Sequence, residues 1–296
     1  MGSRSFTVAI VSDLHAYAKL PEKQNKPSHL SLASTEQTPE NHPIVGLLQT
    51  IDDGSISADL LLCAGDLAHQ ACPESIRYAW DAVGQIQRAL GAAATIGTAG
   101  NHDLDSRFLY TSPDPQQTLK NLIPEFPCTD PNKANQYWAR DYTIVTASPA
   151  VVISLNSSAH HGAVEHEKNH GRVTKDVLSR LRAELQRFRE HPVKILLCHH
   201  HPHQHEELNL GATDVMELGQ QLLDLLATDD SGTWLVVHGH KHHPKISYAA
   251  GGSNSPIVFA SGTSQAGFAC AVLSSLTNCC CVMARPIPFL GSGSGV

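Results

Sequence analysis

The sequence has no excess of positive charge, no long apolar segment and no pattern of a secretion signal. Its 296 residues include 21 lysines and arginines against 28 aspartates and glutamates, a formal net charge of −7. A chain with this balance has no overall basic field to draw it to nucleic acid or to an anionic membrane. No apolar run approaches the roughly 18 residues of a membrane span. We therefore expect a protein of cytoplasmic location that does not contact a membrane.

Paired cysteine spacing is also absent. The eight cysteines show neither the spacing of a thiolate metal site nor a regular disulfide framework, so we expect reduced thiols. The chain has no internal repeat and no clear second domain, which predicts one domain over residues 1–268. Residues 269–296 contain Cys279, Cys280 and Cys281 and a Gly-Ser end, and they are predicted to form an irregular C-terminal tail.

Apolar, β-rich runs alternate with amphipathic helical patterns along most of the chain, which indicates an α/β fold with mainly parallel crossovers. The clearest helical patterns lie at 73–90, after Thr174, and at 214–227. Residues 104–140 are irregular and rich in proline, and we predict a cap or a substrate-side excursion there. The predicted strands lie at 6–11, 58–64, 93–99, 150–155, 193–198, 234–237 and 256–260.

Five of these predicted strands end in a cluster of Asp, Asn or His. A single Asp-x-His or Gly-Asp is more often a turn than a ligand pair. Ligands of open α/β sheets, however, gather outside the carboxyl ends of the strands, so the joint placement favours one shared site. The 19 histidines of the chain are also an unusual excess. The clusters are Asp13-Leu14-His15, Gly65-Asp66-Leu67-Ala68-His69, Gly100-Asn101-His102-Asp103, His199-His200-His201 and His238-Gly239-His240-Lys241-His242.

These clusters supply ligands for transition metals. They contain carboxylates, an amide oxygen and at least four imidazoles, a mixed set that suits Mn, Fe or Zn and is poor for Ca. Such a set exceeds the needs of one tetrahedral site. Two metal ions that share one carboxylate would use the whole set of ligands. A pair of ions roughly 3.5–4 Å apart stabilises both the attacking and the leaving oxygen in displacement at phosphorus.

In their order and spacing the five clusters resemble the motifs of the calcineurin-like metallophosphoesterases. The resemblance spans residues 13–242. It implies a four-layer αββα sandwich with two mixed β-sheets flanked by helices. It also implies an enzyme with two divalent metal ions (Mn, Fe or Zn) that hydrolyses phosphoester bonds by attack of a metal-bound hydroxide at phosphorus.

The resemblance also assigns roles to residues of this chain. Asp66 bridges the two metal ions, His102 is the acid for the leaving oxygen, Asp103 orients His102, and His69 contacts substrate. The adjacent His199, His200 and His201 can each reach the metal, and the family pattern of a ligand two positions before proline favours His200. The ligands are Asp13, His15 and His242 for one ion, and Asn101, which also faces substrate, with His200 and His240 for the other.

Three functions remain open at this stage. The layout is closest to the cyclic-nucleotide and glycerophosphodiester phosphodiesterase branch, and the acidic charge agrees with a small-molecule phosphoester substrate. His69 is similar to the histidine of the DNA-repair exonuclease branch, which favours a nuclease, but the sequence has no long basic stripe for nucleic acid. A non-catalytic binding member of the fold is the third, and the presence of Asn101 and His102 argues against it.

Overall fold

Two β-sheets pack face to face in the computed structural model. The first sheet has five strands in the order β11-β10-β1-β2-β3, and the second has six in the order β4-β5-β6-β7-β9-β8. An apolar cluster joins the two sheets, with Val8 and Leu62 from the first and Val152 and Leu197 from the second. The structure describes residues 5–19, 28, 30–32, 37–106, 114–161, 170–205, 208, 215–228, 232–250, 254–262, 269–276 and 279–286.

The first sheet combines strands from the two ends of the chain. β1 and β2 lie inside the sheet and β3 lies at its edge, and these three strands run parallel, as predicted from their apolar runs. All four residues of β2 are buried, as expected of a strand that is covered on both faces. The strands are β1 (Phe6–Val11), β2 (Leu60–Cys63), β3 (Ala94–Gly97), β10 (Ala269–Leu276) and β11 (Cys279–Pro286).

The second sheet has a parallel centre and antiparallel edges. Strands β5, β6, β7 and β9 run parallel, whereas β4 and β8 are antiparallel to their neighbours. The two edge strands were not among the predicted ones. The strands are β4 (Tyr142–Ala147), β5 (Ala150–Leu155), β6 (Val193–Leu197), β7 (Leu235–His238), β8 (Lys245–Tyr248) and β9 (Ile257–Ala260).

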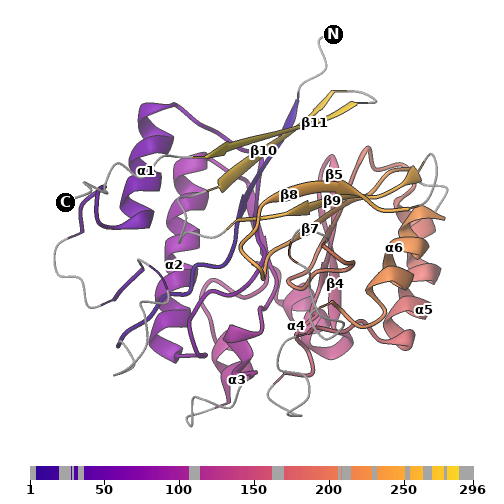
Figure 1. Ribbon diagram of the computed structural model, residues 1–296, viewed down its shortest axis with the longest axis horizontal. Helices are drawn as coiled ribbons and strands as arrows, with labels where there is room; N and C mark the ends of the chain where they lie inside the picture. Colours follow the sequence, from indigo (N-terminus) through magenta and orange to yellow (C-terminus); the bar gives the residue numbers. More distant parts are fainter. Residues whose placement is uncertain are drawn as a thin grey trace.

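Helices cover the outer face of each sheet and complete the predicted four layers (Figure 1). α1 (Pro43–Asp53) and α2 (Pro73–Leu90) pack on the first sheet, and α5 (Lys175–Glu184) and α6 (Gly219–Ala227) pack on the second. The helix predicted after Thr174 is α5, and the Thr174 side chain caps it by accepting a hydrogen bond from Val177 N at 3.2 Å. Among the described residues, no helix has both the length and the apolar character needed to cross a membrane.

The C-terminal segment differs from the predicted irregular tail. Residues 269–286 contain β10 and β11, which pair with each other along their whole length. β10 also pairs antiparallel with β1, so that Ser275 lies opposite Phe6. This partner lies at the far end of the sequence, and a local residue pattern cannot reveal such a pairing. Residues 287–296 lie outside the described part of the chain.

The segment predicted as a cap or substrate-side excursion, residues 104–140, contains two helices in its described part. These are α3 (Pro115–Lys120) and α4 (Pro131–Arg140). Phe126 and Tyr137 are buried in the core beside α2, and the Tyr137 hydroxyl accepts a hydrogen bond from Ala99 N at 2.9 Å. Residues 114–140 therefore support the strand end at which the site lies. Residues 107–113 lie outside the described part.

Candidate metal centre

The five polar clusters meet at one edge of the two sheets. In the first sheet the parallel register pairs Val11 with Cys63 and Cys63 with Gly97, so the chain leaves β1, β2 and β3 side by side. In the second sheet Leu197 pairs with Val237, so the loops after β6 and β7 are also neighbours. The candidate ligands therefore share one edge of the fold, beyond the carboxyl ends of the strands, as expected from the sequence.

One group of potential ligands consists of Asp13, His15 and His242. The Nε2 atoms of His15 and His242 lie 2.9 Å apart. Asp13 Oδ1 lies 3.4 Å from His242 Nε2 and 3.9 Å from His15 Nε2. The Asp13 side chain is fully buried and His15 is 3% exposed. Three ligand atoms so close together, from the two ends of the chain, can hold one metal ion.

A second group forms around Asn101. Its side-chain oxygen lies 3.0 Å from His240 Nδ1 and 3.1 Å from His199 Nε2. His199, His200 and His240 each offer a ring nitrogen within 4.8 Å of the others. Asn101, His200 and His240 were predicted to hold one ion together, and the structure brings all three to the same place. His199 is an additional candidate.

Asp66 lies between the two groups. Its Oδ2 atom is 3.6 Å from His15 Nε2 and 3.3 Å from His199 Nε2. Asp66 is 1% exposed, and its other oxygen accepts a hydrogen bond from His102 N at 2.9 Å. A carboxylate between two ligand groups is in the position that the predicted bridging role requires.

The three adjacent histidines after β6 point in different directions. His199 Nδ1 is 2.7 Å from Ala64 O, which leaves Nε2 directed at Asp66 and Asn101. His200 Nδ1 is 2.9 Å from Ser157 Oγ, and no described residue hydrogen-bonds to its buried Nε2. His201 instead packs against His238, with ring centroids 4.4 Å apart, outside the ligand groups. Both His199 and His200 therefore reach the centre.

Burial and charge set the protonation of these groups. Burial raises the pKa of Asp66, but the charge of His199 and its other neighbours outweighs burial and holds this pKa well below its usual range. Burial lowers the pKa of His199, yet Asp66 dominates and raises it to about 9. Burial lowers the pKa of His15 to about 3 and that of His200 well below its usual range. Neutral imidazole is the form that binds metal, so His15 and His200 are ready to do so.

The backbone around the centre is held in an unusual conformation. Five of the predicted ligands have positive φ angles, a conformation that L-residues rarely adopt and that costs free energy at each position. Such strain clusters at functional sites, where the surrounding structure maintains it. The five are Asp13 (φ 54°), His15 (φ 46°), Asp66 (φ 53°), His240 (φ 84°) and His242 (φ 57°).

Gly100 allows the loop after β3 to approach Asp66. A Cβ atom at this position would overlap the Asp66 carboxyl and its backbone nitrogen.

We expect Gly100→Ala to displace Asp66, to reduce bound metal to less than one ion per chain, and to cost about 1–3 kcal/mol of stability. Metal analysis and thermal melting check this. Gly84→Ala is the control, since its Cβ in α2 would meet nothing closer than 3.5 Å, and it should stabilise by about 0.4–1 kcal/mol. Equal metal content in both variants would contradict the expectation.

The donor set fits two divalent cations. Two buried carboxylates and several neutral imidazoles converge with their acceptor atoms toward one another, an arrangement that needs positive charge between them.

A model of the calcineurin-like phosphoesterase family matches residues 6–244. The chain belongs to this family. It is therefore a metal-dependent phosphoester hydrolase, as its motifs predicted. No curated protein matches it significantly.

Solved structures show the same fold at low sequence identity. A dimetal phosphatase from Danio rerio matches with a TM-score of 0.61 and 13% identity, over 95% of this chain and 96% of that one. A purple acid phosphatase from yellow lupin (Lupinus luteus) matches with a TM-score of 0.55 and 13% identity, over 97% of this chain and 52% of that one. The calcineurin-like phosphoesterase YfkN from Bacillus subtilis matches with a TM-score of 0.50 and 12% identity, over 95% and 90%. These matches support the αββα fold.

Beside the ligand groups of this phosphoesterase lies a pair of imidazoles. The rings of His69 and His102 are stacked, with centroids 5.4 Å apart and an angle of 26°. His102 also meets the ring of His15 edge to face at 4.8 Å. Both rings are only partly buried, unlike His15. The structure thus places the two residues predicted to act on substrate next to the ligands and within reach of solvent.

Asp103 has a clear structural contact on each oxygen. Oδ1 accepts a hydrogen bond from Ala68 N at 3.0 Å, and Oδ2 accepts one from Gly100 N at 2.9 Å. The side chain is fully buried, and burial, followed by the charge of Asp66, raises its pKa to about 7. Asp103 therefore joins the loops after β2 and β3. Its predicted role in orienting His102 stays a prediction.

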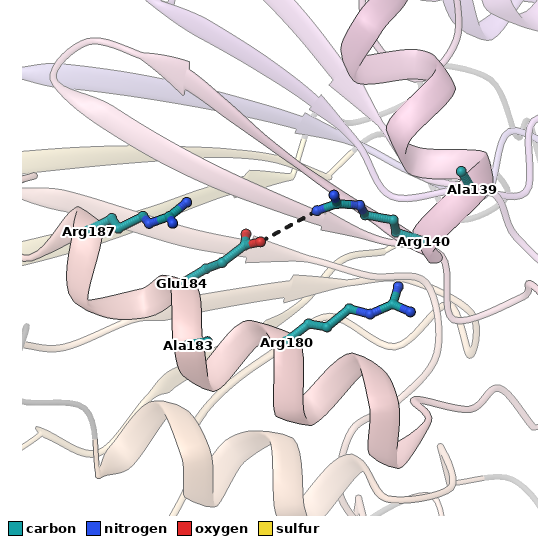
Figure 2. A pocket seen from close by; sticks show the side chains of 6 residues that line it. All are labelled: Ala139, Arg140, Arg180, Ala183, Glu184 and Arg187. Atoms are coloured by element: carbon teal, nitrogen blue, oxygen red, sulfur yellow. Dashed lines mark ion pairs between the residues drawn. The ribbon is translucent and has the colours of Figure 1, made fainter.

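A surface hollow of about 610 Å³ lies away from the metal centre, between α4 and the helical segment after β5. Figure 2 shows its arginines around Glu184, and Arg140 Nη1 lies 3.5 Å from Glu184 Oε1. Arg140 lies at the end of α4, where a cation is favoured by the helix dipole. The hollow contains no carboxylate or imidazole cluster, and its charges fit a structural role. The lining residues are Ala139, Arg140, Arg180, Ala183, Glu184 and Arg187.

We expect Arg140→Ala to leave phosphoester hydrolysis unchanged and to lower the free energy of unfolding by less than about 1 kcal/mol. The Arg140 side chain is 45% exposed, and exposed ion pairs contribute little. Urea unfolding and kcat/KM measured on the same preparation check this. A tenfold loss of activity would show that this hollow, as well as the strand ends, takes part in the reaction.

Proposed function

We propose that this phosphoesterase hydrolyses a small-molecule phosphodiester, such as a cyclic nucleotide, at a centre of two divalent metal ions. The observation that carries the proposal is the position of Asp66, whose Oδ2 lies 3.6 Å from His15 and 3.3 Å from His199. Asp66 would bind both ions. Asp13, His15 and His242 would hold one, and Asn101, His200 and His240 the other, with His199 as a further candidate ligand.

When bound, the two cations would supply positive charge at the phosphoryl group and favour deprotonation of water. The residues of the chain position the reacting groups. His102, beside the ligands but not among those proposed, would give a proton to the leaving oxygen. Its backbone N–H donates to Asp66, which fixes the loop that carries it. His69, stacked on His102, would contact the substrate next to the leaving group.

Charge supports a small substrate. The chain has a formal net charge of −7, which opposes binding of a long polyanion. A single phosphodiester makes a smaller demand, because the two cations themselves offset its charge. The nuclease remains the second candidate because His69, the residue that resembles the exonuclease branch, lies directly against His102.

A substrate panel tests the proposal. The metal-free protein would be given manganese, zinc or no metal, and then cyclic AMP, a single-stranded oligonucleotide, a nitrophenyl phosphomonoester or a bis-nitrophenyl phosphodiester. We expect the highest kcat/KM for the small diesters, and only with metal. More efficient hydrolysis of the oligonucleotide would replace the proposal by a nuclease, and preference for the monoester would replace it by a phosphatase. Saturable binding without turnover under all conditions would identify a non-catalytic member.

A further inference from the structure

The loop after β5 carries histidines that the five motifs do not use. β5 lies parallel to β6, with Ser154 opposite Leu197, so the chain leaving β5 emerges beside His199 and His200. The described start of the loop is a tight turn in which His161 N donates to Ser158 O at 2.9 Å. Ser158 Oγ donates to Ala99 O at 3.0 Å, which ties the turn to the end of β3. The described start of the loop is therefore held at the metal centre.

Two residues of this loop fix His200 from its Nδ1 side. The Ser157 hydroxyl lies 2.9 Å from His200 Nδ1 and accepts a hydrogen bond from His200 N at 3.3 Å. At the other end of the loop, a Cβ atom on Gly171 would overlap the His200 ring and Ser157 O. Only glycine permits this close approach. The loop thus supports a proposed metal ligand from behind, as partners of metal-binding histidines do.

His161 covers the face of the same ligand. Its ring stacks on that of His200 with centroids 5.1 Å apart and an angle of 19°. His161 is 7% exposed, and no described residue hydrogen-bonds to either of its buried ring nitrogens. A buried imidazole with both nitrogens unsatisfied costs free energy, which a ligand at the site would recover.

A hydrogen-bond acceptor such as an oxyanion would satisfy a ring N–H of His161. The groups of described residues whose ligand atoms lie within 4.8 Å of one another do not include His161. The ring instead lies against His200, and therefore beside the group formed by His199, His200 and His240. His102 occupies the other side, beside His15. His102 thus lies beside a ligand of one group and His161 beside a ligand of the other.

We propose that His161 is a substrate-binding residue whose ring N–H donates a hydrogen bond to a phosphoryl oxygen bound beside His200. This inference rests on the proposed function, and it adds a residue outside the family motifs. His161→Phe keeps an aromatic ring for the stack and removes both nitrogens. His161→Asn keeps a donor and loses the stack. The two variants therefore separate hydrogen bonding from packing.

The test is calorimetric titration of the manganese-loaded protein with inorganic phosphate. We expect His161→Phe to raise the Kd of phosphate about tenfold, or 1.4 kcal/mol, and to raise KM for the bis-nitrophenyl diester, with unchanged manganese per chain. His161→Asn should recover part of the affinity. His191→Phe is the control, because His191 lies against Phe188 after α5, with ring centroids 6.0 Å apart, and its variant should bind phosphate as the wild type does.

An unchanged phosphate Kd in His161→Phe, with unchanged manganese content, would overturn the inference. Loss of manganese in that variant would also overturn it, because His161 would then act by holding His200. Thermal melting identifies a variant that fails to fold, and His161→Asn then decides the question by the same criterion. If the wild type itself hydrolyses no phosphoester, the proposed function fails. An active wild type with an unaffected His161→Phe variant contradicts only the assignment of His161.

Discussion

Asp66→Asn is expected to lower kcat for phosphoester hydrolysis by about a thousandfold or more, which corresponds to about 4 kcal/mol of transition-state stabilisation. The substitution keeps the shape of the side chain and an oxygen that can accept from His102 N, as Asp66 does at 2.9 Å. It removes the negative charge that lies between the two ligand groups. The variant should also bind fewer metal ions per chain, because only a carboxylate can bridge the two sites effectively.

The control for this variant is Asp81→Asn, the same chemical change on the exposed face of α2. It should leave both kcat and metal content unchanged. An Asp66→Asn protein with a native melting profile, two metal ions and more than about a tenth of wild-type kcat would contradict the bridging role. If the variant unfolds at a much lower temperature than the wild type, the metal content of the folded fraction still distinguishes loss of a ligand from loss of the fold.

His102→Ala is expected to lower kcat by about a hundredfold to ten-thousandfold, the range for loss of a general acid. Metal content should not change, because the proposed ligands remain. The loss should be largest for a substrate with a poor leaving group, such as a cyclic nucleotide. It should be smallest for a nitrophenyl ester, whose leaving oxygen needs little protonation. The measurement is kcat for each of these two substrates, in the wild type and in the variant.

His191→Ala is a suitable control for the histidine substitution, since His191 packs against Phe188 after α5 and is part of none of the five clusters. An equal loss for both substrates would contradict proton donation and would favour a role in phosphate binding. A loss of metal would place His102 among the ligands, where its ring lies close to those of His15 and His69.

The strand ends were predictable because each cluster follows directly on an apolar run. A buried strand such as β2 has a local pattern, and Asp66 follows three residues after the end of this strand. Asp13 likewise follows β1, and Asn101 follows β3. Since parallel strands end at one edge of the sheet, the fold class was enough to predict that these side chains lie close together.

Other parts of the fold depend on contacts that no local pattern reveals. β10 and β11 form because β1 offers its free edge to the opposite end of the chain. The directions of His199 and His200 depend on Ala64 O and Ser157 Oγ, which lie in loops after other strands. Residue order favoured His200, but only these long-range contacts show that His199 also reaches the centre.

His161 illustrates the same limit within the site. The sequence shows a loop rich in histidine after β5, but nothing in its spacing distinguishes His161 from its neighbours. Its position follows from the parallel pairing of β5 with β6 and from the turn that Ser158 fixes. The rule that strand ends meet at one edge, applied to β5 as well, would have drawn attention to this loop.

The most direct test of the two-metal account is the number of metal ions bound per chain in active protein. Mass spectrometric metal analysis of protein reconstituted with manganese or zinc, together with kcat on the best diester, makes this measurement. The account predicts two ions per chain, activity that follows occupancy of the second ion, and at most one ion in Asp66→Asn. Full activity with a single ion per chain, or with none, would contradict it.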